Sequence, residues 1–222
     1  MPPQATEIAT LPLIAGAKLD SGDIGKLWDD ALNTIAKTPG YQKMFWGRQV
    51  EHPDVLQLCI DWDSIEAHQA FMASPAYGPF GQGLGKILGG PPNLYHINLP
   101  PSSPFSGPAA APVTELVSLY FPPDFATEEF DLNWIKFQGL IQNSAEGYHG
   151  STGAWSVEEA TYKGMGKDGA EGPAKLFFAS IGWDSVDAHM KYRETDAFKD
   201  AIPLLRQGCS AIEMYHVKFA TY

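Results

Sequence analysis

The stretch LCIDWDSIEAH, residues 58–68, decides the fold because it returns as ASIGWDSVDAH at residues 179–189, an offset of 121. Downstream, the pair Tyr95-His96 returns as Tyr215-His216 at an offset of 120. Upstream, Gly40-Tyr41 returns as Gly147-Tyr148 at an offset of 107. Ordered matches of this kind indicate a tandem repeat. The offset increases from 107 to 121 along the chain, which predicts an insertion in the second copy, mainly at residues 164–172.

The segment between the copies, residues 100–112, contains five prolines. Proline fixes φ and lacks a backbone N–H, so we expect an extended linker with no helix and no central strand. The chain then divides into a first domain over residues 5–99, the proline-rich linker over 100–112, and a second domain over 113–222.

Hydrophobic periodicity predicts the same order of elements in each copy. The expected strands cover 7–17, 41–51, 55–62 and 93–99 in the first copy, and 113–121, 147–158, 175–183 and 211–220 in the second. One amphipathic helix follows the first strand of each copy and another follows the third, where Asp63 or Ser64 is the expected cap in the first copy. This is the ferredoxin-like βαββαβ motif of the α+β class, an antiparallel sheet with both helices on one face. Each sheet leaves its other face bare, so we expect the sheets to pair face to face, within the chain or through a homodimer.

Composition restricts the class of partner. The chain has 222 residues, 44% of them hydrophobic, and 15 Lys and Arg against 26 Asp and Glu give a net charge of −11. Such an acidic chain repels phosphate backbones and anionic lipids, so we expect no nucleic-acid and no membrane partner. The first residues lack the basic-then-apolar layout of a secretory signal, and Cys59 and Cys209 are expected as free thiols. We therefore expect a cytoplasmic protein.

The motif at residues 62–68, followed by Ser74-Pro75-Ala76-Tyr77, resembles the antibiotic-biosynthesis-monooxygenase family of dimeric α/β barrels. Gly40-Tyr41, the segment FWGRQ at 45–49 and the second copy's counterparts fit the same pattern. The resemblance extends to two-domain fungal members associated with secondary metabolism. The resemblance implies one of several activities, because the family contains cofactor-free oxygenases of phenols and anthrones, haem-degrading enzymes, cyclases, isomerases and members without known activity.

Several side chains are candidates for a site between each sheet and its helices. His68 and His189 are candidate general bases, and Arg48 and Tyr41 are candidates for stabilising an enolate. Because only the first copy has a cation at the position of Arg48, this pattern favours the first domain as the active one. The candidate substrate-binding residues are Trp28, Trp46, Tyr77, Trp134, Tyr148, His149 and Trp155. The alternative is that these rings only fill the core, and that His96 and His216 pack in the sheet.

Metal and cofactor motifs are missing from the sequence. It has no His-Glu-x-x-His and no cysteine cluster, and residues 77–81 and 198–202 lack the histidine that ligates iron in haem-degrading relatives. Together with this absence, the resemblance implies an enzyme without metal or cofactor that acts on a small hydrophobic, aromatic, polyketide-like molecule, with a monooxygenase as the activity that the resemblance favours. A cyclase or isomerase using the same base without dioxygen is the alternative, as is a non-catalytic small-molecule-binding or stress protein.

Overall fold

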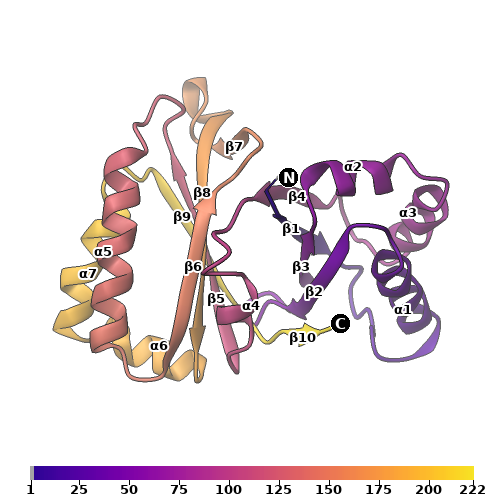
Figure 1. Cartoon of the computed structure of the whole chain (residues 1–222), viewed down its shortest axis with the longest axis horizontal. Helices are drawn as coiled ribbons and strands as arrows, with labels where there is room; N and C mark the ends of the chain where they lie inside the picture. The colour runs from indigo at the N-terminus through magenta and orange to yellow at the C-terminus, as the bar shows by residue number, and fades with distance from the viewer. Residues whose placement is uncertain (1–2) are drawn as a thin grey trace. The chain divides into compact units, whose positions relative to one another are not determined.

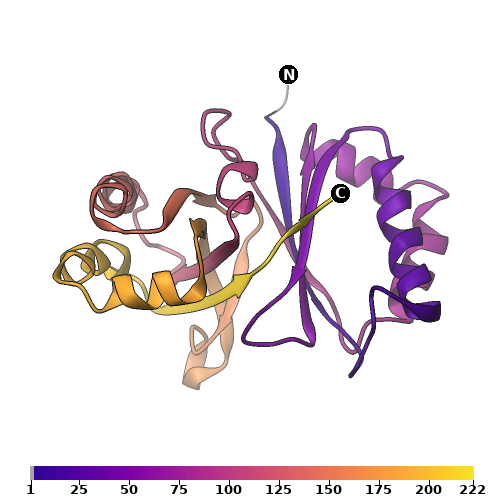
Figure 2. The same ribbon diagram turned by 90° about the horizontal axis from the view of Figure 1, so that it is seen from below.

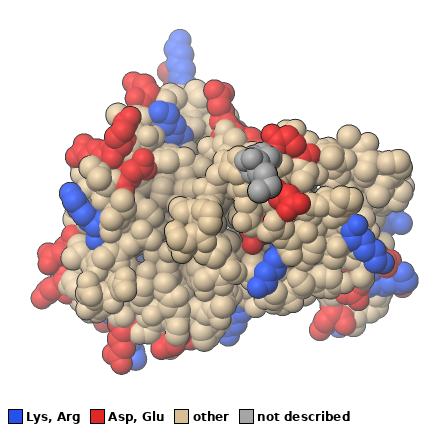
Figure 3. All heavy atoms as spheres, viewed as in Figure 1, with Lys and Arg blue, Asp and Glu red and all other residues tan. Residues whose placement is uncertain are grey.

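The structure is a computed structural model that describes residues 3–222. The chain divides into two compact units. The first unit contains everything described before Leu99, together with Val217–Tyr222, and the second contains Leu99–His216. No helix among the described residues is long and apolar enough to cross a membrane. On the face drawn in Figure 3, Lys and Arg side chains are scattered among Asp and Glu.

The first unit is an antiparallel sheet with its helices on one face (Figures 1 and 2). Its strand order is β10-β2-β3-β1-β4. The elements are β1 (Ala5–Pro12), α1 (Gly22–Ala36), β2 (Tyr41–Arg48), β3 (Val55–Trp62), α2 (Ile65–Met72), α3 (Tyr77–Gly85), β4 (Asn93–Ile97) and, from the chain's end, β10 (Ala220–Thr221).

The second unit repeats this topology, with strand order β6-β8-β5-β9. Its elements are β5 (Val113–Phe121), α5 (Glu128–Ser144), β6 (Tyr148–Trp155), β8 (Glu171–Trp183), α6 (Val186–Arg193), α7 (Asp196–Arg206) and β9 (Ala211–Val217). Two ferredoxin-like units are therefore confirmed. The single second helix expected in each copy is instead a pair, because Ser74-Pro75 interrupts the first and the Thr195 side chain caps a new helix in the second.

The repeated Trp-Asp-Ser motif forms the same junction in both units. Ser64 and Ser185 are the helix caps, and their hydroxyls accept the backbone N–H groups of Ala67 and Ala188. Gly40 has a φ of +87°, and a Cβ there would lie 2.5 Å from Ala67 Cβ, so the strand can pass this close to the helix only as glycine.

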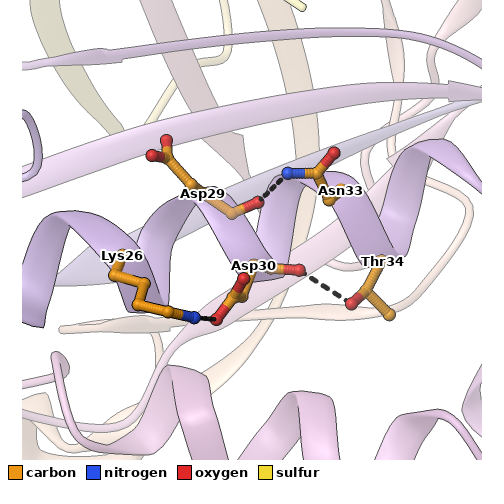
Figure 4. Close-up of polar contacts among 5 residues, drawn as sticks. All are labelled: Lys26, Asp29, Asp30, Asn33 and Thr34. Carbon is orange, nitrogen blue, oxygen red and sulfur yellow. Dashed lines mark hydrogen bonds and ion pairs between the residues drawn. The ribbon is translucent and has the colours of Figure 1, made fainter.

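The core of each unit lies between its sheet and its helices. In α1, the buried face carries Trp28, Ala31, Leu32 and Ile35. The opposite face is polar: Lys26 pairs with Asp30 at 2.7 Å, and two side chains bond back to the preceding turn (Figure 4). This division of polar and apolar faces is the amphipathic pattern that the spacing predicts.

The extended linker is a wrong prediction. Residues 106–109 form a short helix, α4 (Ser106–Ala109), which packs against β6 and β8 and belongs to the second unit. Phe105 is fully buried and its ring lies 6.5 Å from that of Phe178. Pro108 is tolerated because a four-residue helix is almost entirely first turn, where backbone N–H groups have no partner inside the helix.

The insertion of the second copy extends a hairpin. A short strand, β7 (Ala160–Lys163), pairs with the first residues of β8, and the turn between them contains a 3-10 segment, η1 (Lys167–Gly169). Tyr162 from β7 packs on Tyr120 with ring centroids 4.2 Å apart. The insertion is therefore part of the second unit's fold.

Candidate active site

Both units contain the same buried group of one glutamate, one tryptophan and two histidines. The glutamate comes from the opening strand, the tryptophan from the end of the third strand, one histidine from the following helix and the other from the closing strand. The residues are Glu7, Trp62, His68 and His96 in the first unit, and Glu115, Trp183, His189 and His216 in the second. All eight are at most 7% exposed.

In the first unit the four side chains form a connected chain of contacts. Trp62 Nε1 donates to Glu7 Oε2 at 2.9 Å, and His68 Nε2 lies 3.5 Å from the same oxygen. The other nitrogen of His68, Nδ1, is 2.8 Å from His96 Nε2. The His68 ring stacks on Trp62 with centroids 5.1 Å apart. Glu7 and His96 are directly opposite each other on β1 and β4, which places both on the helix-covered face.

The second unit reproduces these distances. Trp183 Nε1 donates to Glu115 Oε2 at 2.9 Å, and His189 Nε2 lies 3.5 Å from that oxygen. His189 Nδ1 is 2.8 Å from His216 Nε2, and the His189 ring stacks on Trp183 at 5.0 Å. The two copies therefore have the same arrangement of these four side chains. The tryptophan and the histidines lie in the motifs that reveal the duplication, whereas the glutamates lie outside them.

The group has the parts of an acid–base site. An indole N–H can only donate, so the glutamate is the acceptor of that bond. Between the two histidines one ring nitrogen donates and the other accepts. In the tautomer with the proton on Nδ1, His189 donates to His216 and keeps Nε2 as an acceptor. Nε2 lies 3.5 Å from Glu115 Oε2, so a proton taken up there would face the carboxylate, and an opposite charge at this distance favours the protonated ring.

The cavities beside the two groups differ in size. In the second unit a cavity of about 250 Å³ lies between sheet and helices, and Glu115, Trp183 and His189 line it. The corresponding cavity of the first unit, lined by Glu7, Trp62 and His68, has about 70 Å³. The remaining lining of the larger cavity is Val117, Leu119, Phe137, Ile141, Ile181, Tyr192, Arg193, Phe198, Ile202, Leu205, Arg206, Ile212 and Met214. The second unit therefore has room for a ligand beside its buried polar group.

The copies differ at one position on the helix that covers the small cavity. At the offset of 121 that aligns the tryptophans, Ala201 of α7 corresponds to Phe80 of α3. Phe80 lines the small cavity, where its ring lies 5.3 Å from Phe71 and 5.7 Å from Tyr77. An alanine at this position removes a whole phenyl ring from the helix face above the polar group.

The structure brings together only some of the predicted site residues. His68 and Tyr77 line the first cavity, and His189 lines the second. Arg48 is outside both linings, because its guanidinium donates to the backbone carbonyls of Pro53 and Ala17. Tyr41 is also outside them; its hydroxyl donates to the carbonyl of Tyr222.

The other predicted substrate-binding residues take part in local packing or lie near the surface. Trp28 packs edge-on against Trp46 at 5.3 Å, and Trp134 stacks on Phe137 at 5.6 Å. Tyr148 shares a hydrogen bond with Ser151, His149 Nε2 lies 2.5 Å from Asp184 Oδ1, and Trp155 Nε1 donates to Asp131. These six residues lie outside the linings of the two cavities, and their substrate-binding role stays a prediction.

Sequence reasoning missed Glu7 and Glu115, one in each polar group, and the two arginines that line the second cavity. The glutamates have a readable signal: the opening strands ATEIATL, residues 5–11, and VTELVSL, residues 113–119, repeat a lone acid inside an apolar strand at an offset of 108. A charged side chain that points into the core is costly unless it has a polar partner. The repeated glutamate therefore indicates a buried polar group in each copy. Arg193 and Arg206 stand at the ends of α6 and α7 with no motif around them.

One of the two polar groups also offers ligand atoms to a metal. Glu7, His68 and His96 each present one such atom within 4.8 Å of the others. However, the 2.8 Å between His68 Nδ1 and His96 Nε2 is a hydrogen-bond distance, so a metal would have to replace the proton between the rings. The absence of a metal cofactor stays a prediction.

The comparisons with known proteins agree with this architecture. Residues 20–82 match the family model described as antibiotic biosynthesis monooxygenase. No curated protein matches the chain. Among solved structures, an anthrone oxidase-like protein has a TM-score of 0.68 at 14% identity, covering 99% of this chain and 92% of its own. A candidate monooxygenase from Lactobacillus acidophilus has a TM-score of 0.61 at 11% identity, covering 98% and 94%.

The chain consists of two ferredoxin-like units, and each unit has a buried polar group between its sheet and its helices. At identities this low the solved structures support the fold only, over nearly the whole chain. The family match lies in the first unit. The chain is therefore similar to the antibiotic biosynthesis monooxygenase family over residues 20–82.

Proposed function

We propose that the chain is a cofactor-independent enzyme that acts on a small hydrophobic or aromatic, polyketide-like molecule in the cavity of its second unit, as a monooxygenase. One observation carries the proposal: Glu115 and His189 line an apolar cavity of about 250 Å³, which is large enough to hold a ring system beside a proton acceptor. The similar structure described as anthrone oxidase-like bears the name of a reaction of the same class, which supports the reaction type.

The proposed reaction begins with removal of a proton from a phenol or an activated carbon. His189 accepts the proton, and the resulting imidazolium is stabilised by Glu115 on one side and His216 on the other. The electron-rich anion then reduces dioxygen directly. For an activated CH₂ group, one O₂ converts the carbon to a carbonyl and leaves one water, so no external reductant is required.

Two other functions use the same cavity. A cyclase or isomerase needs the same base but no dioxygen, and a binding protein needs neither. A requirement for dioxygen distinguishes the monooxygenase from the cyclase or isomerase, and turnover distinguishes an enzyme from a binding protein.

A cytoplasmic location belongs to the proposal and is supported by the two free cysteines, Cys59 and Cys209. Homodimerisation through a sheet face also belongs to it and is checked by light scattering in solution.

The experiment measures oxygen uptake and quinone formation with an anthrone, with no added cofactor and with the uncatalysed rate subtracted. Glu115→Gln and His189→Gln are expected to lower the rate by about 10²–10³-fold, the usual loss for an acid–base group. Glu7→Gln and His68→Gln are the matched controls, because they change the same group beside the smaller cavity, and they are expected to keep the rate within about twofold.

Thermal unfolding of all four variants checks that a lost rate is not lost folding. Equal losses in both pairs would contradict the assignment to the second unit. Conversion without dioxygen would favour the cyclase or isomerase, and tight binding without turnover would favour the binding protein.

A further inference from the structure

We infer that the ligand of the second cavity carries an anionic group, which Arg193 and Arg206 bind at the cavity's open side. The inference rests on the proposed function, since it names the substrate class of that same cavity. It comes from the distribution of arginine. The whole chain has three arginines and a net charge of −11, yet two of the three line this one cavity.

Both guanidinium groups are available to a ligand. Arg193 approaches Met190 Sδ at 3.8 Å and lies 6.0 Å above the Phe198 ring, but among the described residues neither arginine has a carboxylate within 4.0 Å. By contrast, Lys199 on the same helix as Arg206 is paired with Asp196 at 2.7 Å. An arginine without a protein carboxylate at the edge of an apolar cavity presents up to five N–H donors to an incoming anion.

The charges along the cavity give the ligand a direction. Glu115 is 7% exposed and lies in the cavity wall, whereas both arginines are exposed at its edge. A ligand anion is repelled by the buried carboxylate and attracted by the guanidinium groups, so its ring system enters first. This orientation directs the neutral aromatic part toward His189 and keeps the anionic part near solvent.

The first unit lacks this arrangement. At the offset of 121, Met72 and Gly85 correspond to Arg193 and Arg206, and the smaller cavity is lined by no Lys or Arg. The arginines therefore accompany the larger cavity and not the polar group that both units share. The larger cavity is therefore also the one with two cations, which indicates an aromatic acid, such as an aryl carboxylate, as the ligand class.

The test compares 2-naphthoate with 2-naphthamide, which has nearly the same shape but no charge, by calorimetry on the full chain at pH 7. We expect 2-naphthoate to bind at least about tenfold more tightly, a difference of about 1.4 kcal/mol. Arg193→Gln and Arg206→Gln should each remove most of that preference without changing the affinity for 2-naphthamide. Lys199→Gln, an exposed cation on α7 outside the cavity lining, is the matched control and should change neither affinity.

Equal affinities for the two ligands, or a preference that both arginine variants retain, would overturn the inference while leaving the cavity and the proposed function intact. Binding of neither ligand would overturn both, because the cavity would then not accept an aromatic ring. Anthrone turnover that persists in Arg206→Gln together with lost 2-naphthoate preference would support anion recognition separate from catalysis.

Discussion

Replacing Trp183 with phenylalanine tests whether the indole N–H stabilises the buried carboxylate of Glu115. The N–H donates at 2.9 Å to a glutamate that is 7% exposed, so water cannot easily take its place. A hydrogen bond to a charged group contributes about 1.5–3 kcal/mol, and the smaller ring leaves a void that costs about 1–2 kcal/mol. We therefore expect Trp183→Phe to lower the free energy of unfolding by about 2.5–5 kcal/mol.

A double-mutant cycle separates the hydrogen bond from the void. Glu115→Gln keeps an acceptor for the indole but removes the charge, so the double variant should lose less than the two single variants together, by about 1–2 kcal/mol. Urea unfolding followed by circular dichroism gives each value, with hydrogen exchange identifying which unit opens. Trp62→Phe and Glu7→Gln form the equivalent cycle in the first unit, where the same 2.9 Å bond is present.

A loss below about 1 kcal/mol for Trp183→Phe, together with a coupling near zero, would refute the reasoning. It would mean that the carboxyl group is neutral or hydrated in solution, and that the indole contributes only by packing. Agreement between the two cycles would indicate that the four-residue group stabilises both units in the same way.

Three further predictions concern the first unit. Phe80→Ala should open the small cavity, so that 2-naphthamide binds with a stoichiometry of two instead of one by calorimetry; an unchanged stoichiometry would show that Phe80 does not limit the volume. Arg48→Ala should lower the free energy of unfolding by about 1–3 kcal/mol, through the two carbonyls left without a donor, and leave ligand affinity unchanged. Burial raises the pKa of the Asp61 carboxyl, so its charge costs stability once the pH rises through the folded-state pKa. Asp61→Asn, which keeps an acceptor for Thr6, should therefore stabilise the chain more at pH 7 than at about pH 3 in urea unfolding.

The fold was predictable because its determinants are local and occur twice. The predicted bounds of the third strand of the first copy and the opening strand of the second match β3 (Val55–Trp62) and β5 (Val113–Phe121). Hydrophobic spacing and turn residues act over a few positions, so one chain displays them without structural information. The linker failed for the opposite reason. Its proline content says what the backbone disfavours, but the burial of Phe105 against the second unit's sheet depends on residues far along the chain.

The site was predictable only in part, because lining a cavity depends on packing between distant elements. His68 and His189 lie in the cavity linings, as their helix positions predicted, and their role as bases stays a prediction. The preference for the first domain rested on Arg48, whose strand position gave no sign that the carbonyls of Ala17 and Pro53 would engage it. The cations of the larger cavity are instead at helix ends, where arginine is also common for its interaction with the helix dipole.

The comparison of the two units separates the role of the polar group from the role of the cavity. The four side chains have the same distances in both units, so their mutual geometry does not depend on a ligand-sized space. Where Phe80 fills the first cavity, the group still satisfies its buried donors and acceptors, and that alone is a reason for it to be present in the fold. In the second unit, the cavity leaves room beside an already ordered carboxylate and imidazole. A base that the fold holds in position needs little reorganisation when a substrate enters, so space and the two arginines, more than a new catalytic group, distinguish the second unit.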